Sequence, residues 1–476
     1  MSLTRNIASN TVQQVIGKAL STAIGIWVLS AVTTYLGTGG YGQYIIIISF
    51  LSFFSILADL GLYVILTKKI SEPGADEQRV TANIFTMRLV TAVVLLGLAP
   101  LVVMLFPYAP IVKTGIAITT FSFLFITLTQ VLYGVFQKHL AVYKIAFAEN
   151  AGRVVLLIGT LLVIHFNGGL LWIMAVVVFG SFCNLLLTTI WVQRYVRLQL
   201  RWEWDVWKDV LHASWPIALS IVFNLVYFRA DALILAYYWP DSDVGIYGQP
   251  YKILEVLASI PAIFAGLALP VLTNAFARND RSRFFRVLQK SVDALLMMAV
   301  PLVIGTYFVA TDVVVWISKP AFAPSGPVLR ILILATAMIF LGNLFANTVV
   351  AINKQKTIIL GYAAVAVIAI VGYFYFIPRY SYFGAAWMTV ATEGLMMLIS
   401  MILVYRTTRA PFSFSVPLRI VLSAAVMGFA MWLVSDIHFL LRILMGVVVY
   451  GIMILSTGAL NKQTLQDLRS SGGIST

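Results

Sequence analysis

Charged residues are scarce in this sequence, and histidine and cysteine are scarcer still. Only 11% of the 476 residues are charged and 61% are hydrophobic, whereas roughly a quarter of an ordinary soluble domain is charged. The single Cys183 has no partner for an intrachain disulfide, and the 4 histidines show no metal-ligand spacing. The composition therefore excludes a soluble core and indicates neither a disulfide framework nor a metal site.

Long polar connections are also missing. The longest connection on one side of the hydrophobic stretches is about 194–212, and the longest on the other is about 310–325. Membrane polymerases and glycosyltransferases usually carry their chemistry on a large external loop, and no such loop fits here. The GxxxxGK[ST] phosphate loop is absent as well. We therefore expect no enzymatic activity and no cofactor.

What the sequence does contain is a series of long apolar stretches. Crossing a bilayer core of ~30 Å takes about 20 helical residues at 1.5 Å each. The stretches of that length predict fourteen membrane-spanning helices, at 11–36, 42–67, 81–106, 111–137, 146–165, 169–193, 213–239, 248–275, 287–310, 325–350, 357–377, 382–405, 416–435 and 439–458. We read the first of them as a retained helix because no small-residue cleavage site follows it.

Lys and Arg alternate strictly between the two sides of these predicted spans. One side carries 22 of them and the other only Lys113, Lys319 and Arg379. The positive-inside rule then places both termini in the cytoplasm. The same rule accounts for the net charge of +14, so we expect no nucleic-acid partner.

Two sequence matches indicate an internal repeat. Gly-Tyr-Gly-Gln at 40–43 and Ile-Tyr-Gly-Gln at 246–249 are 206 residues apart, and Gly-Leu-Leu-Trp at 169–172 and Gly-Ala-Ala-Trp at 384–387 are 215 apart. Each match lies at the start of equivalent spans, which favours two pseudo-symmetric six-helix bundles in parallel relation. The predicted domains are an N-terminal lobe at 1–200, a C-terminal lobe at 201–410, and two further helices with a cytoplasmic tail at 411–476.

Ionisable residues inside predicted spans are the candidates for function, because a charge at the bilayer centre costs at least ~2.5–3.5 kcal/mol. Glu149 and Arg153 have the i, i+4 spacing of a helical ion pair, and Lys252 and Glu255 have i, i+3 spacing. Arg88 and Arg229 lie too deep to reach water at a helix end. Two interpretations stay open: the cations line a cavity that attracts an anion, or they pair with nearby carboxylates and hold the bundles together.

The sequence around the predicted span 213–239 resembles that of a known protein family. Trp204 to Pro216, Arg229 to Leu235, Asp243 to Tyr247, and Leu269-Pro270 are similar to the polysaccharide-unit (Wzx-type) flippases of the MOP exporter superfamily. In that family a Pro starts the seventh helix, an Asp lies within it, and a Val-Gly-x-Tyr element precedes the eighth. The matching residues here are Pro216, Asp231, Val244, Gly245 and Tyr247, and Asn10, residues 39–44 and Glu393 also look similar.

The resemblance implies two six-helix lobes forming a V around a central cavity, with alternating access. It further implies an oligosaccharide on a polyprenyl diphosphate as the substrate, moved from the cytoplasmic to the outer leaflet of a bacterial cytoplasmic membrane. We expect a monomer that works with membrane lipids and with the polysaccharide polymerase machinery. A proton or sodium gradient, or the membrane potential, would drive transport.

Two sets of residues carry this hypothesis. The expected diphosphate-binding cations are Arg88, Arg229, Lys18, Lys252 and Arg153; the expected coupling or charge-balancing carboxylates are Asp59, Asp231, Glu255 and Glu393. Two alternatives are a peptidoglycan-precursor (lipid II) flippase and a cation-coupled multidrug exporter of the same superfamily. The sequence names neither the glycan nor the coupling ion.

Overall fold

The computed structural model describes residues 3–59 and 61–460, without the side chains of residues 3–16, 216, 217, 219, 220, 222–228, 263 and 267. The side chains of Asn10 and Pro216, named above, therefore lie outside the described residues. Every regular element in the two described ranges is a helix, in agreement with the all-α prediction.

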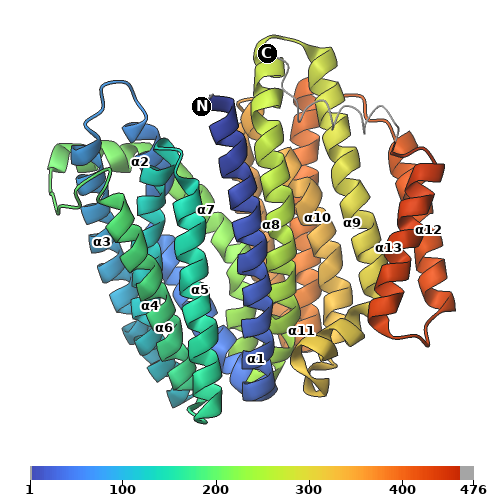
Figure 1. Ribbon diagram of the computed structural model, residues 1–476, viewed down its shortest axis with the longest axis horizontal. Helices are drawn as coiled ribbons and strands as arrows, with labels where there is room; N and C mark the ends of the chain where they lie inside the picture. Colours follow the sequence, from blue (N-terminus) through green and yellow to red (C-terminus); the bar gives the residue numbers. More distant parts are fainter. Residues whose placement is uncertain (1–2, 60, 461–476) are drawn as a thin grey trace. The chain divides into compact units, whose positions relative to one another are not determined.

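The helices follow one another along the chain (Figure 1). They are α1 (Leu3–Asp59), α2 (Leu62–Ile70), α3 (Glu77–Val102), α4 (Pro110–Lys138), α5 (Val142–His165), α6 (Gly169–Val192), α7 (Trp204–Tyr238), α8 (Asp241–Ala277), α9 (Arg281–Ser318), α10 (Ser325–Ala351), α11 (Gln355–Thr408), α12 (Ser415–Leu433) and α13 (Phe439–Ser456), with short 3-10 turns at Val103–Leu105 and Pro320–Phe322.

Within the described part of the chain, 11 helical segments are long and apolar enough to cross a membrane. Large apolar side chains such as Leu98, Leu101 and Leu444 are exposed along them, as expected where lipid rather than water surrounds the helix. The prediction of a multi-pass helical membrane protein is therefore confirmed.

The helices α1 and α11 are each interrupted by one non-helical residue. Gly37 has φ 67° and Ser381 has φ 48°, inside helical segments of 57 and 54 residues. Glycine adopts positive φ without a Cβ clash. Ser381 lacks that freedom, and its Oγ donates a hydrogen bond of 2.5 Å to Asp243 Oδ2, which stabilises a conformation that costs about 1–3 kcal/mol. Both breaks fall between predicted spans.

Several helices begin six or more residues earlier than the apolar pattern predicts, namely α1, α7, α8 and α9. The α7 helix begins at Trp204 instead of 213, and α8 begins at Asp241 instead of 248. A hydropathy pattern detects only the part of a helix that faces lipid. The first turns of α7 are amphipathic, with Trp207 and Val210 buried and Lys208 exposed, so this segment is held by packing rather than by hydropathy.

The chain divides into two compact units. Unit 1 comprises residues 1–248, 317–321 and 370–385, and unit 2 comprises the remainder. In unit 1, α6 packs against both α4 and α5, α1 packs against α5, and α7 contacts α1, α2 and α3. The predicted lobe boundary at 200/201 stays a prediction.

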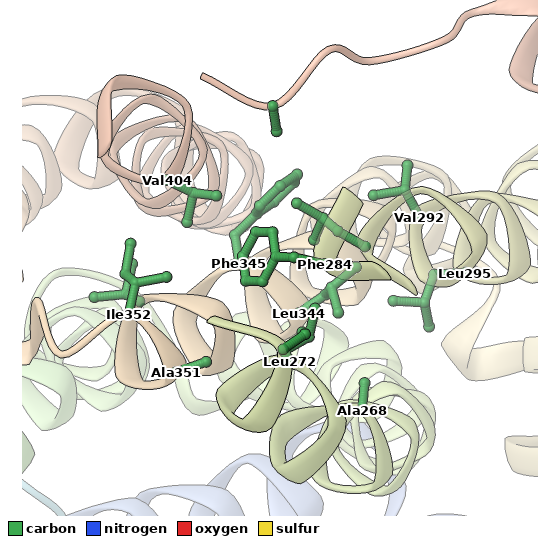
Figure 2. Packing of buried hydrophobic residues seen from close by; sticks show 14 of the residues in the cluster. Ala268, Leu272, Phe284, Val292, Leu295, Leu344, Phe345, Ala351, Ile352 and Val404 are labelled. Carbon is green, nitrogen blue, oxygen red and sulfur yellow. The ribbon is translucent and has the colours of Figure 1, made fainter. Parts of the chain in front are cut away.

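Each unit has its own apolar core. In unit 1, Leu62, Leu66, Val131 and Phe136 pack around the buried Trp207. In unit 2, Leu272, Phe284, Leu295, Leu344 and Phe345 join α8, α9 and α10 (Figure 2). Because lipid tails are as apolar as these side chains, close packing and dispersion stabilise such cores. The α12 and α13 helices lie side by side in unit 2.

Candidate functional site

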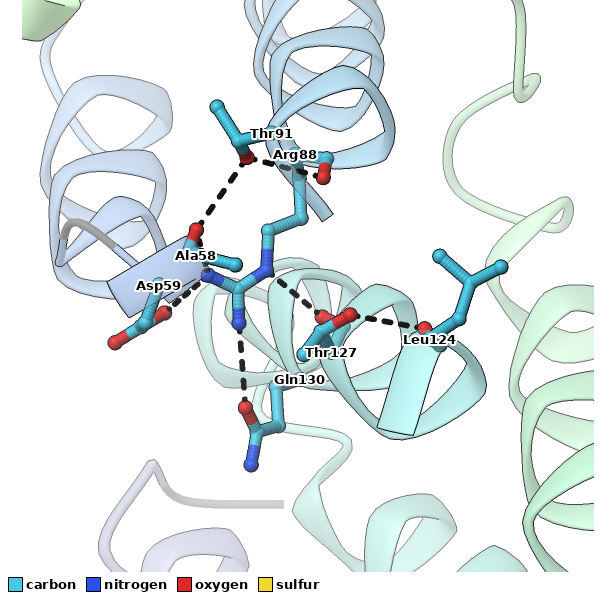
Figure 3. Close-up of polar contacts among 7 residues, drawn as sticks. All are labelled: Ala58, Asp59, Arg88, Thr91, Leu124, Thr127 and Gln130. Carbon is cyan, nitrogen blue, oxygen red and sulfur yellow. Dashed lines mark hydrogen bonds and ion pairs between the residues drawn. The ribbon is translucent and has the colours of Figure 1, made fainter. Parts of the chain in front are cut away.

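The Arg88 side chain lies at the centre of a buried polar network in unit 1 (Figure 3). Its guanidinium is 0% exposed, and Nη1 lies 2.7 Å from Asp59 Oδ1. Arg88 follows the start of α3 by eleven residues, or about 16 Å of helix. A cation at that depth needs partners within the protein, and Asp59 supplies the charge.

Three further acceptors surround the same guanidinium. Nη1 donates to the Ala58 carbonyl at 2.8 Å, Nε to the Thr127 carbonyl at 3.2 Å, and Nη2 to Gln130 Oε1 at 3.4 Å. Ala58 lies in the last described turn of α1, where a cation is favoured by the helix dipole. The Ala58 carbonyl also accepts a hydrogen bond of 3.3 Å from Thr91 Oγ1. In this conformation Arg88 caps α1 and presents no exposed surface to a ligand.

A second polar contact region joins α1 and α5. Gly17, Ser21 and Gly25 recur every fourth residue on α1, a small-residue spacing that lets two helices approach closely. Across this contact, Asn150 Nδ2 donates to the Gly17 carbonyl at 3.0 Å, and Arg153 Nη1 donates to the Ser21 carbonyl at 3.0 Å. Arg153 of α5 therefore binds the backbone of α1, one turn from Lys18.

The two cations at this contact are more accessible than Arg88. Lys18 is exposed and Arg153 is half-buried. The i, i+4 ion pair that the sequence predicts between Glu149 and Arg153 is absent from the ion pairs of the described residues. Arg153 extends to α1, whereas Glu149 interacts with Tyr133 of α4. Tertiary partners thus replace the local pair.

The α4 helix connects the two regions. Gln130, Tyr133 and Gln137 are spaced three and four residues apart and share one face of the helix. Gln130 accepts from Arg88, and Tyr133 contacts the side chains of Glu149 and of Asn184 on α6. We call these polar side chains the polar belt of unit 1; it comprises Lys18, Asp59, Arg88, Gln130, Tyr133, Glu149, Asn150 and Arg153.

Reasoning from ionisable residues within the spans does not find the uncharged members of this belt. The i, i+3, i+7 spacing of Gln130, Tyr133 and Gln137 was a usable signal, since a lipid-facing helix does not place three polar side chains on one face.

Other predicted residues of unit 1 lie near the α7–α8 connection. Asp231 is 1% exposed and accepts a 2.5 Å hydrogen bond from the Tyr247 hydroxyl. Arg229 is half-buried. Nearby in sequence, the start of α8 crosses α1 so closely that a Cβ at Gly245 would meet the Thr38 carbonyl. Gln43 Nε2 donates to Asp241 Oδ2 at 3.0 Å at the same crossing.

The remaining predicted residues belong to unit 2. Lys252 Nζ lies 2.7 Å from Glu255 Oε2, with the lysine side chain 50% exposed, so this i, i+3 pair forms as predicted. Glu393 on α11 is 8% exposed and close to Tyr362. Within residues 3–59 and 61–460, Glu393 has neither a hydrogen bond nor an ion pair. The structure thus pairs Arg88 with Asp59 and Lys252 with Glu255, and Arg153 contacts α1 at Ser21, one turn from Lys18.

No metal-binding arrangement accompanies these residues: the described ranges contain no group of three or more His, Cys, Asp or Glu placed to hold an ion. The predictions that Lys18, Arg153, Arg229 and Lys252 bind a diphosphate, and that no cofactor is required, stay predictions.

Comparison with known proteins bears on what such an arrangement serves. Residues 35–325 match a protein-family profile described as "Polysaccharide biosynthesis protein". A comparison with curated protein sequences found no match.

Solved structures with the same fold include a lipid II flippase, MurJ, in an inward closed conformation, with 16% identity and a TM-score of 0.77 over 94% of this chain and 98% of that one. An inward-facing multidrug resistance MATE transporter of the MOP superfamily has 12% identity and a TM-score of 0.66, over 83% of this chain and 98% of its own.

A MOP superfamily transporter from Pyrococcus furiosus, whose binding pocket is described as reversed in polarity, has 13% identity and a TM-score of 0.59 over 85% of this chain and 96% of that one. At these identities the likeness shows the fold alone, and that fold is the one found in MurJ and the MATE transporters.

Proposed function

Because this chain belongs to the polysaccharide biosynthesis protein family and has the MurJ and MATE fold, we propose that it is a flippase. Its substrate is an oligosaccharide repeat unit on a polyprenyl diphosphate. The protein moves this lipid from the cytoplasmic to the outer leaflet of the bacterial cytoplasmic membrane by alternating access, and both of its termini are cytoplasmic.

The proposal includes fourteen spans arranged as two six-helix bundles and a C-terminal pair. Two of the 11 candidate spans contain an interruption, at Gly37 and Ser381; dividing each of them gives thirteen. The 35-residue α7 adds the fourteenth. The even number agrees with the alternation of basic and non-basic connections.

The accessible cations of the polar belt carry the proposal. Lys18 is exposed and Arg153 is half-buried where α1 meets α5. Among the described residues, the Arg153 side chain donates a hydrogen bond from Nη1 alone. Guanidinium groups bind phosphate through several donors, and an ammonium adds a point charge. A diphosphate would satisfy the remaining donors of Arg153, with Arg229 and Lys252 contributing later in the cycle. Arg88, already bonded to four acceptors, is expected to act only if Asp59 releases it.

Movement of a negative head group outward is favoured by an inside-negative membrane potential, by ~2.3 kcal/mol per charge per 100 mV. Among the carboxylates that could sense a proton or sodium gradient, Glu393 is the strongest candidate because it is buried without an ion-pair partner in the described ranges. Asp59 and Asp231 are held by Arg88 and Tyr247.

A lipid II flippase is the second candidate, favoured by the similarity to MurJ over 94% of this chain. Both substrates present a diphosphate, so the polar belt does not separate them. A multidrug exporter for organic cations is less compatible with Lys18 and Arg153, which would repel such a substrate.

Reconstitution tests the proposal. Proteoliposomes would receive a fluorescent undecaprenyl-diphosphate oligosaccharide or lipid II, and a membrane-impermeant reagent would report the outer-leaflet fraction. We expect flipping of the oligosaccharide lipid, and a rate about tenfold or more lower in Lys18→Glu, because charge reversal repels the diphosphate. Exposed Lys356→Glu provides a control of equal charge change. Faster transport of lipid II would favour the second candidate, and an unchanged rate in Lys18→Glu would refute the role of the belt.

A further inference from the structure

The connection between α6 and α7 is a fixed basic and aromatic surface. Residues 193–202 contain Arg194, Arg197 and Arg201 and no carboxylate. All three arginines are exposed. Leu200 and Trp202 in the same segment are exposed by 66% and 61%. We call residues 193–202 the basic strap.

Side chains of α3 hold the backbone of this strap. Gln78 makes two hydrogen bonds to Arg197, accepting from its N–H at 2.8 Å and donating to its carbonyl. Thr86 Oγ1 accepts from the Arg201 N–H at 2.9 Å. Just beyond the strap, Asn83 Oδ1 accepts from the Glu203 N–H at 2.8 Å. Because three polar side chains fix the backbone, the arginine side chains start from defined positions.

The aromatic side of the strap is also ordered. Trp202 stacks on Trp207, with ring centroids 4.2 Å apart and planes 25° apart. Trp207 is buried in the core of unit 1, so Trp202 is supported from below while its other face stays exposed. Tryptophan prefers the level of lipid head groups, where one part of the ring is apolar and another part is wet.

We propose that the basic strap is a binding site for anionic phospholipid head groups of the leaflet that faces the basic connections. No carboxylate lies within the strap, and the carboxylate of Glu203, just beyond it, is held by Arg79 and Asn83. The three guanidiniums therefore fit lipid phosphates and an additional negative head group. Leu200 and Trp202 enter the adjacent interface. The prior fixing of the backbone lowers the ordering cost of binding. This site is separate from the polar belt and does not depend on the transport substrate.

Charge alone does not distinguish the strap from other basic connections. The α8–α9 connection carries Arg278, Arg281 and Arg283, which are also exposed. That segment contains Asp280 and has no exposed aromatic residue between 277 and 283. The strap is therefore expected to bind anionic lipid more tightly than the α8–α9 connection, which makes the latter a matched control.

The experiment measures lipid binding to the purified full-length protein in detergent by native mass spectrometry. Phosphatidylglycerol and phosphatidylcholine with identical acyl chains are titrated in parallel. We expect tighter binding of phosphatidylglycerol to the wild type. Replacing Arg194, Arg197 and Arg201 together by Gln should weaken that binding about 100-fold, at about a factor of five for each cation near a head group. The triple Gln variant of Arg278, Arg281 and Arg283 should keep it within about threefold of the wild type, since it leaves the strap intact.

The Gln78→Ala variant distinguishes lipid binding at a preorganised site from attraction by the net charge of the protein. It leaves every charge in place and removes both bonds to the Arg197 backbone, so binding of phosphatidylglycerol should fall about threefold to tenfold through lost preorganisation. Equal binding of the two lipids would overturn the proposal. So would equal losses in the two triple variants, because the effect would then be one of total charge. Thermal unfolding of each variant without added lipid checks that the fold is retained.

Discussion

Removing the Asp59 carboxylate tests whether the buried Arg88 is held as a structural cation. Arg88 is 0% exposed and Asp59 is 27% exposed, with 2.7 Å between Nη1 and Oδ1. In Asp59→Ala, the guanidinium would stay buried without its counter-charge. Breaking such a pair costs about 3–5 kcal/mol. Because the Ala58, Thr127 and Gln130 acceptors remain, we expect the free energy of unfolding to fall by about 3 kcal/mol, the lower end of that range.

The control is an ion pair with the same nitrogen–oxygen distance in a more exposed environment. Lys252 and Glu255 are also 2.7 Å apart, but the lysine side chain is 50% exposed. Lys252→Ala should therefore cost no more than about 0.5–1 kcal/mol. Unfolding by sodium dodecyl sulfate, followed by the loss of helical circular dichroism in mixed micelles, measures both variants.

A double-mutant cycle then isolates the interaction. Asp59→Ala and Arg88→Met together should cost less than the sum of the two single changes, with a coupling energy of about 2 kcal/mol. If Asp59→Ala costs no more than Lys252→Ala, the carboxylate does not hold Arg88. The Arg88 side chain would then be free to serve an anionic ligand, contrary to the conclusion from its geometry.

Three further predictions address the α1–α8 crossing, the polar belt and the Arg79–Glu203 ion pair next to the strap. Gly245→Leu should lower the free energy of unfolding by about 1–3 kcal/mol or more in the same assay, because the added side chain meets the α1 backbone. Gly97→Ala is the control and should not destabilise, because a Cβ there meets open space. Equal losses of stability in the two variants would contradict the close crossing. Arg153→Gln should lower the flipping rate about tenfold, because a neutral amide replaces the charged, bidentate guanidinium. The unfolding midpoint should stay within a few degrees of wild type. A wild-type flipping rate would exclude a contact between Arg153 and the substrate. The hydrogen bond from Arg79 lowers the pKa of Glu203; this stabilisation is present above the ordinary Glu pKa of about 4.3 and is lost as pH falls through the lowered folded value. Thermal unfolding of the wild type should thus weaken more steeply below about pH 4.5 than that of Arg79→Ala, and parallel pH profiles would count against the ion pair.

Much of the fold is predictable from this sequence because the membrane imposes simple rules on it. Every backbone polar group in hydrocarbon must be bonded within its own helix, so long apolar stretches become helices. Most predicted spans fall within described helices, but the span 42–67 is divided between α1 and α2, because Gly61 at the start of α2 has φ 71°. The matches at 40–43 and 246–249 lie near the starts of helical segments, after Gly37 and in the first turns of α8. The same rule does not determine where each helix begins and ends. Trp204 to His212 are amphipathic, and only the packing of Trp207 and Val210 places them in α7.

The roles of the charged residues were decided by tertiary structure. Apolar length, the alternation of basic connections and the depth of Arg88 and Arg229 follow from the order of residues alone, because lipid constrains each helix separately. Whether a cation is already bonded to acceptors within the protein or is accessible to a ligand depends on which helices pack against it. Arg88 meets the end of α1 and is fully bonded, whereas Arg153 crosses to α1 and leaves its expected partner Glu149 to Tyr133. The α1 partners of Arg88 and Arg153 lie about 30 to 130 residues away along the chain, beyond the reach of any local spacing rule.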